Sequence, residues 1–238
     1  MIKAEIDKFE ELASNWWKFG TSSFDMLHQM NPVRIKYIKQ LIFKYLGFSK
    51  KNDLSNLDIL DAGAGGGIAT ISLAKIGAKI DGIDAGEKNI IAAQEYKKSN
   101  DISNVNFICS SIEDFNPNKL YDVIICLEVL EHLENTKTII AHLTSLLKHD
   151  GLIFISTLDK SYLSWLMSIV FAENILHFLP KNTHEYDKFI SPNLLINFLE
   201  ENNMKILDVS GINWLPNNFR ISKKILSNYI ISAQKIAF

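Results

Sequence analysis

The 238-residue sequence has no basic excess, few cysteines and no long uninterrupted apolar run. Its formal net charge is −2, whereas dedicated nucleic-acid-binding domains are normally basic, so we expect no nucleic-acid partner. Cys109 and Cys126 each lie in an apolar run and form no metal-type pair, which predicts two core thiols in a reducing compartment. The N-terminal stretch is acidic throughout and lacks the apolar core of a secretory signal, so we expect a cytoplasmic protein.

Apolar segments typical of strands alternate with helical segments through the middle of the chain. Five strands are predicted there, at residues 57–63, 78–86, 105–111, 121–133 and 152–158, the fourth running into a loop. This alternation predicts a parallel sheet with right-handed crossovers. Two further strands are predicted at residues 204–212 and 228–236, the last one antiparallel. The fold class is therefore α/β, with a mostly parallel seven-stranded sheet and helices on both faces.

Helical patterns surround these strands. Helices are predicted over residues 5–19, from Pro32 to Leu46, and over residues 135–151, where Gly151 ends the helix. Another begins at Ser191 and Pro192, which suit the cap and first-turn positions. We expect one domain over residues 1–238. Its parts are a helical N-terminal cap (1–55), a core (56–158), an apolar insertion (159–190) and a C-terminal helix with strands (191–238).

The stretch "ILDAGAGGGIAT", residues 59–70, is an apolar strand that breaks into a glycine-rich turn. A dinucleotide fingerprint beginning at Gly63 requires a third glycine where Ile68 stands, which disfavours a nicotinamide oxidoreductase. A nucleotide-triphosphate loop requires Gly-Lys-Ser/Thr, and no lysine comes before Lys75. Neither phosphate-binding motif is therefore present.

What remains is Asp61-x-Gly63-x-Gly65-x-Gly67, followed by Asp84 at the end of the second strand. An acidic residue about 20 positions beyond the first glycine accepts hydrogen bonds from ribose hydroxyls. Because no pyrophosphate is required, S-adenosylmethionine is the predicted ligand. The alternative is an ordinary strand-to-helix turn with a surface aspartate.

These residues, together with "YDVIICLEVLEHL", resemble the class I S-adenosylmethionine-dependent methyltransferases, whose sheet is Rossmann-like. The resemblance is closer to one family, the ubiquinone-pathway O-methyltransferases. It rests on "KFEELASNWWKF", "LHQMNPVRIKYI", "STLDKSYLSWLMSIVFAENIL" and "LPKNTHEYDKFISP", and it covers nearly the whole chain. The sequence departs from the family at Ala64, where a cysteine is usual, and at Asn182, where glycine is frequent. Because position 64 offers backbone, we expect Ala64 to be harmless.

The resemblance implies four cofactor contacts, at Arg34, Gly63, Asp84 and Leu127. The guanidinium of Arg34 suits the cofactor carboxylate, since its planar fork can donate two parallel hydrogen bonds. Leu127 ends the fourth strand, where it can contact the adenosine or methionine part of the cofactor. Without the resemblance, a surface arginine and a core leucine would be the simpler interpretations. Weaker candidates for the adenine follow the third strand, at Ser111 and Ile112.

Glu128, Glu131 and His132 form an E-x-x-E-H motif after the fourth strand. On a helical turn, positions i, i+3 and i+4 face one way, so the three side chains could hold a divalent metal. Carboxylates suit Mg²⁺, whereas imidazole favours a transition metal such as Zn²⁺. The resemblance also implies a metal here. The alternative is that the motif borders the pocket or caps a helix without metal.

The resemblance further implies methylation of phenolic hydroxyls on polyprenylated catechol or hydroquinol intermediates of ubiquinone biosynthesis. A phenol must lose its proton to become a good nucleophile, and His132 and His184 are the candidate bases, neither one assigned. Two other functions stay open. One is methylation of another small phenol or acid, and the other is a catalytically silent subunit of a ubiquinone-biosynthesis complex.

The insertion over residues 161–179 is rich in apolar residues but is interrupted by Glu173, Asn174 and His177. A membrane span needs about 20 apolar residues in a row, so we expect no span here. The segment suits an amphipathic lid, an interfacial membrane contact or a core helix. A polyprenylated substrate favours the first two, and the contact would then be peripheral, on the inner face of the plasma membrane.

Overall fold

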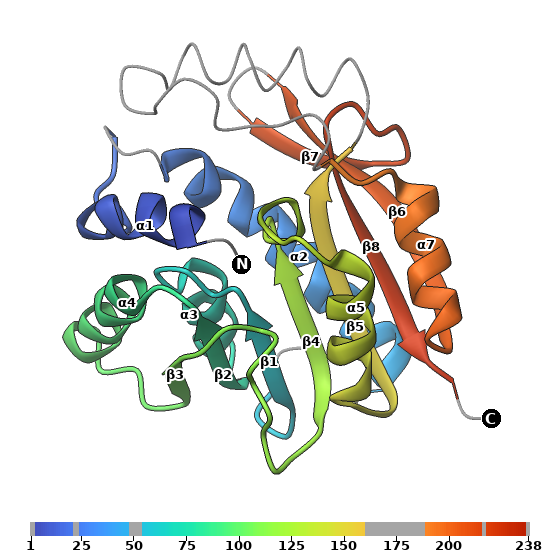
Figure 1. Cartoon of the computed structure of the whole chain (residues 1–238), viewed down its shortest axis with the longest axis horizontal. Coiled ribbons are helices and arrows are strands. Elements are labelled where there is room, and N and C mark those ends of the chain that lie inside the picture. Colours follow the sequence, from blue (N-terminus) through green and yellow to red (C-terminus); the bar gives the residue numbers. More distant parts are fainter. Residues whose placement is uncertain (1–2, 21–23, 48–53, 160–188, 216–217, 237–238) are drawn as a thin grey trace.

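The computed structural model describes residues 3–20, 24–47, 54–159, 189–215 and 218–236. One sheet lies between two layers of helices (Figure 1). The helices are α1 (Lys3–Glu11), α2 (Asp25–Leu46), α3 (Ile68–Ala74), α4 (Glu87–Ser99), α5 (Thr136–Ser145) and α7 (Pro192–Glu201), with 3-10 turns at Ala13–Asn15 and Leu130–His132. The strands are β1 (Asp58–Ala62), β2 (Lys79–Asp84), β3 (Val105–Cys109), β4 (Tyr121–Leu127), β5 (Leu147–Leu158), β6 (Met204–Leu215), β7 (Asn218–Ser222) and β8 (Asn228–Lys235).

The sheet order is β3-β2-β1-β4-β5-β8-β6-β7. The first five strands in this order are parallel, as predicted, and β8 lies antiparallel between β5 and β6. The prediction of seven strands was one short, because β7 pairs with β6 at the sheet edge. This strand has only five residues, of which Phe219 alone is buried, so its apolar signal is weak.

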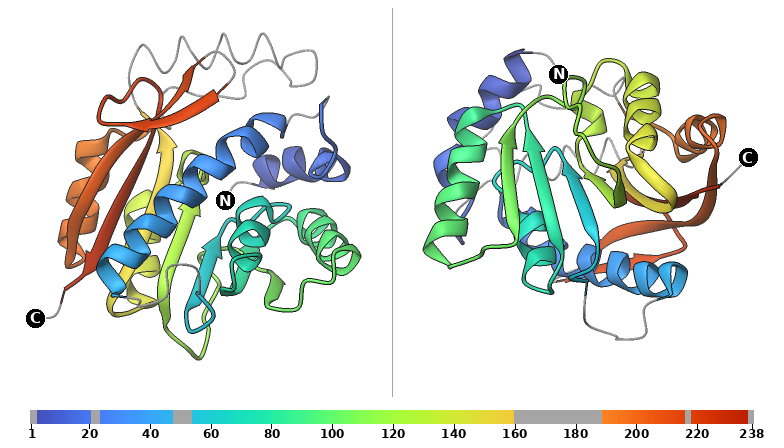
Figure 2. Two further views of the ribbon diagram at one scale, coloured as in Figure 1. Left: turned by 180° about the vertical axis from the view of Figure 1, so that it is seen from behind. Right: turned by 90° about the horizontal axis from the view of Figure 1, so that it is seen from below.

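The two faces of the sheet are apolar because successive side chains of a strand point to opposite sides. Ile59 contributes to the core under α2, α3 and α4, whereas the next residue, Leu60, contributes to the core under α5 and α7. Figure 2 shows α2, α3 and α4 together on one face of the sheet. Helices on both faces leave the carboxyl edge of the parallel strands as the place where a ligand can reach the backbone.

Three predicted helix boundaries were wrong, two of them in the N-terminal part of the chain and one at the end of α5. The N-terminal helix ends at Glu11 and is followed by a separate 3-10 turn. The next helix begins at Asp25, so Pro32 lies inside α2 and not in its first turn. The buried face of α2, which includes Ile38 and Ile42, offsets the helix-breaking tendency of an internal proline. By contrast, Ser191 and Pro192 occupy the predicted cap and first-turn positions of α7.

The helix predicted over residues 135–151 ends at Ser145, and β5 already begins at Leu147. The strand then shifts register between its pairings at Leu147 and Leu152, so the polar "KHDG" lies within an irregular strand. Cys126 is buried, but the prediction of a second core thiol was wrong, since Cys109 ends the edge strand β3 and is exposed.

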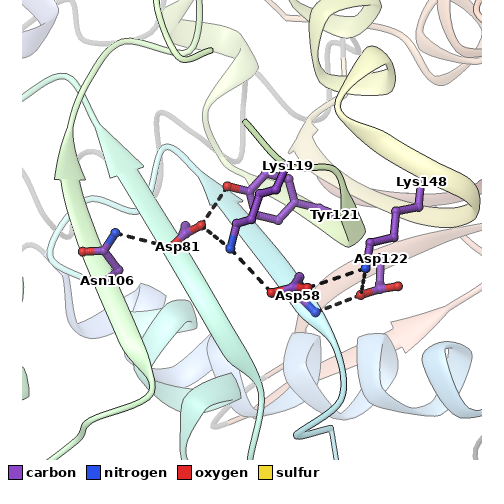
Figure 3. Close-up of polar contacts among 7 residues, drawn as sticks. All are labelled: Asp58, Asp81, Asn106, Lys119, Tyr121, Asp122 and Lys148. Carbon is purple, nitrogen blue, oxygen red and sulfur yellow. Dashed lines mark hydrogen bonds and ion pairs between the residues drawn. The ribbon is translucent and has the colours of Figure 1, made fainter. Parts of the chain in front are cut away.

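Polar residues join the amino-terminal parts of the strands (Figure 3). Lys119 Nζ lies 2.8 Å from Asp81 Oδ2, which also accepts a 2.8 Å hydrogen bond from the Tyr121 hydroxyl. Lys148 Nζ lies 2.8 Å from Asp122 Oδ2. These contacts connect β2, β4 and β5 at the edge opposite to the glycine turn, where they fix the sheet without occupying its ligand-binding edge.

Within the ranges given above, no helix is both long and apolar enough to cross a membrane. The predicted insertion over residues 161–179 lies outside the described residues, as does His184.

Candidate functional site

The glycine turn after β1 is held against the end of β2. The amide nitrogens of Gly63 and Ala64 both donate to the carbonyl oxygen of Ile83, at 2.9 and 2.8 Å. Gly63 has a φ of +82°, and a Cβ added there would lie 2.4 Å from Val129 Cγ2. Only glycine combines this left-handed conformation with so close an approach. The turn therefore brings bare backbone to the carboxyl edge of the sheet.

Two tryptophans from the N-terminal segment lie on this turn. The ring of Trp16 is so close that a Cβ on Gly66 would come within 2.2 Å of its Cγ. Trp16 also stacks on Phe24, with ring centroids 3.6 Å apart. Trp17 Nε1 donates a 2.9 Å hydrogen bond to the carbonyl oxygen of Gly66. Residues 3–18, which contain α1 and the 3-10 turn at Ala13–Asn15, thus form an N-terminal cover whose two tryptophans lie on the glycine turn.

An open pocket of about 750 Å³, including the solvent at its mouth, lies between this cover and the carboxyl edge of the sheet. All four predicted cofactor contacts line it: Arg34, Gly63, Asp84 and Leu127. Of the E-x-x-E-H motif, Glu128 and His132 line the pocket too. Other lining residues were not predicted from the sequence, among them Phe9, Trp16 and Asn89.

A smaller neighbouring pocket shares Gly63 and Asp84 with the first one. Its walls include Ser111 and Ile112, the two residues predicted near an adenine. Asp84 and Gly63 therefore border both pockets.

The carboxylate of Asp84 is held in a fixed orientation by three donors. Oδ1 accepts from Gly86 N at 2.9 Å and from Asn89 Nδ2 at 3.0 Å, and Oδ2 accepts from Gly65 N at 2.9 Å. Burial raises the pKa of Asp84, and these three hydrogen bonds oppose that rise. An oriented carboxylate at a pocket wall is the acceptor that a ribose diol requires.

Arg34 is buried in α2, and its side chain is only 4% exposed. Its Nη1 lies 3.9 Å from Glu128 Oε1, beyond hydrogen-bonding distance. Neither Nε nor Nη1 has a hydrogen-bond partner within the described part of the chain. Burial lowers the pKa of Arg34, while Glu128 and Asp61 oppose that change. Buried polar atoms are normally paired, so this guanidinium is suited to an anionic group of a ligand in the pocket.

Asp61, also in the pocket wall, accepts a 2.6 Å hydrogen bond from Thr70 Oγ1. Burial raises its pKa to about 6, although Thr70 and Arg34 act in the opposite direction. The hydrogen bond ties the end of β1 to α3. Asp61 therefore supports the turn on which Gly63 lies.

Glu128 directly follows β4 and has a φ of +57°, rare for a residue with a side chain. Oε1 accepts from Ser156 Oγ and Oε2 accepts from Asn228 Nδ2, both at 2.7 Å. Burial and the neighbouring Glu131 raise the pKa of Glu128 to about 7. This carboxyl group can thus exchange a proton near neutral pH.

His132 belongs to the 3-10 turn after Glu128, and its Nδ1 donates to Glu5 Oε2 at 3.2 Å. The ring of Phe9 packs edge-on against it, with centroids 5.1 Å apart. Burial lowers the pKa of His132, but the hydrogen bond to Glu5 and the nearby carboxylates outweigh burial and raise it. Two residues of α1 thus hold the ring at the pocket.

The E-x-x-E-H motif does not form the predicted ligand set as it is placed. Glu131 accepts a 2.7 Å hydrogen bond from Thr157 Oγ1, while Glu128 and His132 have the partners given above. Across the part of the chain that the structure describes, no three His, Cys, Asp or Glu side chains are grouped so that they could hold a metal ion. Metal binding by this motif stays a prediction.

This chain is similar to known methyltransferases. Residues 26–209 match the methyltransferase domain family. The ubiquinone biosynthesis O-methyltransferase of Rickettsia felis is 38% identical over 231 residues, which cover 96% of this chain and 92% of that protein. The protein of the same name from Colwellia psychrerythraea is 40% identical over 238 residues, covering 98% and 96%.

Solved structures show the same fold at low identity. Magnesium protoporphyrin IX methyltransferase from Synechocystis PCC 6803, with bound SAH, has a TM-score of 0.68 at 20% identity and covers 98% of this chain and 95% of that one. An S-adenosylmethionine-dependent methyltransferase from Clostridium acetobutylicum has a TM-score of 0.66 at 13% identity, covering 87% and 92%. The predicted Rossmann-like methyltransferase fold is confirmed. With relatives 38% and 40% identical over nearly its whole length, the chain belongs to the ubiquinone biosynthesis O-methyltransferases, a family of S-adenosylmethionine-dependent enzymes.

Proposed function

We propose that this protein transfers the methyl group of S-adenosylmethionine to a phenolic hydroxyl of a polyprenylated catechol or hydroquinol in ubiquinone biosynthesis. One observation carries the proposal for the site. A single pocket contains both a buried arginine with unpaired nitrogens and an oriented carboxylate. The cofactor has one group for each, a carboxylate and a ribose diol.

The pocket residues that would hold the cofactor follow from this observation. Asp84 would accept hydrogen bonds from the ribose hydroxyls, and Arg34 would donate to the methionine carboxylate. Gly63 would give the cofactor access to the backbone, Leu127 would pack against it, and Ser111 and Ile112 of the smaller pocket would border the adenine. The residues present fit the cofactor, because Nε and Nη1 of Arg34 have no hydrogen-bond partner among the described residues and suit a carboxylate.

The reaction is an in-line displacement. When bound, S-adenosylmethionine would supply an activated methyl group for displacement by the phenolic oxygen, and its sulfur would leave as a neutral thioether. Correct placement of donor and acceptor is the main contribution that a protein makes to such a step. The phenolic proton must pass to a base. Glu128 and His132 both line the pocket, and we propose them as the candidate groups that would accept it.

We further propose that residues 1–238 act as one domain in which residues 159–190 meet the substrate's isoprenoid tail or a lipid surface. The support is compositional, since the segment is apolar but too interrupted to span a membrane. Replacing Trp165 and Phe171 by serine should reduce co-sedimentation with liposomes. It should also raise the KM for long-tailed substrates more than for short-tailed ones. Unfolding of this variant would instead make the segment ordinary core.

The direct test of function is incubation with labelled S-adenosylmethionine and a short-tailed polyprenyl catechol, followed by the mass of the product. A gain of one methyl group is expected. Calorimetric titration with the cofactor separates the alternatives. No binding below millimolar concentration would favour a silent subunit, whereas binding without methylation of the catechol would favour another acceptor. The Asp84→Ala variant is the control for the site and should bind the cofactor about one to two decades more weakly.

A further inference from the structure

Asn89 links the N-terminal cover to the carboxylate of Asp84. It lies in the first turn of α4 and is 3% exposed. Its Oδ1 accepts a 2.9 Å hydrogen bond from Trp16 Nε1, and its Nδ2 donates a 3.0 Å hydrogen bond to Asp84 Oδ1. The indole nitrogen can only donate and the carboxylate can only accept, so one orientation of an amide satisfies both.

The Trp16 end of this link cannot move independently of the cover. The indole ring stacks on Phe24 and lies against the backbone of Gly65 and Gly66, where an added Cβ would come within 2.6 and 2.2 Å of the ring. Helix α1 comes shortly before Trp16 in the chain, and the hydrogen bond between Glu5 and His132 attaches this helix to the pocket. If the cover lifts, the hydrogen bond from Trp16 to Asn89 must break.

The Asp84 end determines how the carboxylate faces the pocket. Oδ1 is shared between Gly86 N and Asn89 Nδ2, and Oδ2 receives Gly65 N. Two of these three donors are backbone groups, and among the described residues Asn89 is the only one whose side chain donates to Asp84. A substitution at Asn89 therefore removes one of the three hydrogen bonds that orient Asp84 and leaves the two backbone donors in the chain.

We propose that Asn89 is a positioning residue that couples closure of the N-terminal cover, residues 3–18, to cofactor binding at Asp84. The coupling rests on the placement of the ribose at Asp84 in the proposed function. Linkage is reciprocal: if closure orients Asp84 for the ribose, then bound cofactor holds the cover closed by the same factor. Typical couplings between two sites are about 5- to 150-fold.

The test is a double-mutant cycle on cofactor affinity. Trp16→Phe keeps an aromatic ring on Phe24 but removes the indole donor, and Asn89→Ala removes both hydrogen bonds. Each variant is expected to bind S-adenosylmethionine about 5- to 10-fold more weakly. The double variant should be no weaker than Asn89→Ala alone, because both changes break the same link.

Trp17→Phe is the matched control. It removes an indole hydrogen bond of the same 2.9 Å length, from the adjacent residue to the backbone of the same turn, but one that does not lead to Asp84. Its effect should add to that of Asn89→Ala. Hydrogen exchange is a second measurement, and its result would not change if the role of Asn89 were merely structural. Cofactor should slow exchange in residues 3–18 of the unmodified protein but not in Asn89→Ala.

Additive effects of Trp16→Phe and Asn89→Ala, or equal protection of residues 3–18 in both proteins, would overturn the coupling. If Asn89→Ala does not fold, the Trp16→Phe and Asp84→Asn pair decides the question in the same way. A normal affinity in Asp84→Asn would instead show that the ribose is placed wrongly. Loss of affinity in Asp84→Asn with additive behaviour elsewhere would leave the proposed function intact and reject the coupling alone.

Discussion

Arg34→Met is expected to stabilise the free protein while it removes most of its affinity for S-adenosylmethionine. The arginine is buried, and two of its nitrogens have no hydrogen-bond partner within the described ranges. Such a group is costly in the folded state and becomes useful only when an anion enters the pocket. Methionine fills a similar space without a charge and adapts its shape to the cavity.

The magnitude follows from two opposing changes. Each unsatisfied buried polar group costs about 1–3 kcal/mol, whereas removal of one member of a buried ion pair costs about 3–5 kcal/mol when the other member stays charged. The lost ion pair is weak, since Arg34 Nη1 and Glu128 Oε1 are 3.9 Å apart. Glu128 keeps its hydrogen bonds to Ser156 and Asn228 and has a pKa of about 7, so it can take up a proton. We expect a net gain of about 1–3 kcal/mol, which raises the Tm by roughly 3–10 °C in a chain of this size.

Cofactor binding changes in the other direction. If Arg34 holds the methionine carboxylate as proposed, loss of two charge-assisted hydrogen bonds would cost about 2–4 kcal/mol, so the Kd should rise roughly 30- to 1,000-fold. Thermal unfolding without ligand and calorimetric titration measure the two quantities separately. Arg220→Met is the control, because this exposed arginine on β7 should affect neither. A lower Tm for Arg34→Met, or an unchanged Kd in a folded protein, would refute the reasoning.

Three further changes have defined outcomes. Gly66→Ala should displace the indole of Trp16, because the new Cβ would lie 2.2 Å from it. Tryptophan emission should therefore shift to longer wavelength, and the affinity for the cofactor should fall. Unchanged emission would contradict the close contact. If the E-x-x-E-H motif binds metal, a chelator should abolish turnover and Mg²⁺ or Zn²⁺ should restore it, whereas full activity in excess chelator would end that prediction. The hydrogen bond to His132 lowers the pKa of Glu5 to about 2, and Glu5 contributes to the raised pKa of His132. The stability that Glu5 contributes is present above its ordinary pKa of 4.5 and is lost as the pH falls toward 2. The stability that His132 contributes is present below its ordinary pKa of 6.5 and is lost as the pH rises through its raised pKa. Protection of α1 from hydrogen exchange, corrected for intrinsic rates, should therefore be greatest between about pH 4.5 and 6.5 and should lose this pH dependence in Glu5→Gln.

The parallel half of the fold was predictable because its signals are local. The strands β1, β3 and β4 are short, mostly apolar segments, and the glycines after β1 need no distant partner to be recognised. Helix ends were less certain, since "SLLKHDG" continues the helical period of α5 while tertiary pairing draws Leu147 into β5. The short edge strand β7 was missed for a related reason: its place is set by pairing with β6.

The candidate site divides in the same way. Gly63 and Asp84 could be predicted from spacing alone, whereas Arg34 required the family resemblance, because nothing local distinguishes it from a surface arginine. Asn89 could not be predicted at all. Its importance comes from Trp16, 73 positions earlier in the chain, and from an amide whose two ends meet different partners. No periodicity or composition encodes such a contact.

The position of β8 has a consequence for how the protein is made. This strand comes late in the chain, yet it lies inside the sheet, paired with β5 over seven residue positions and with β6 on its other side. During synthesis the edges of β5 and β6 therefore wait, unpaired and apolar, until residues 228–235 have emerged. Such open edges are the surfaces through which nascent chains associate wrongly. Asn228, the first residue of this strand, also supplies a hydrogen bond to Glu128. Completion of the sheet therefore also supplies one of the hydrogen bonds that Glu128 accepts at the pocket, so a chain that stops short of β8 lacks both the paired sheet and this contact.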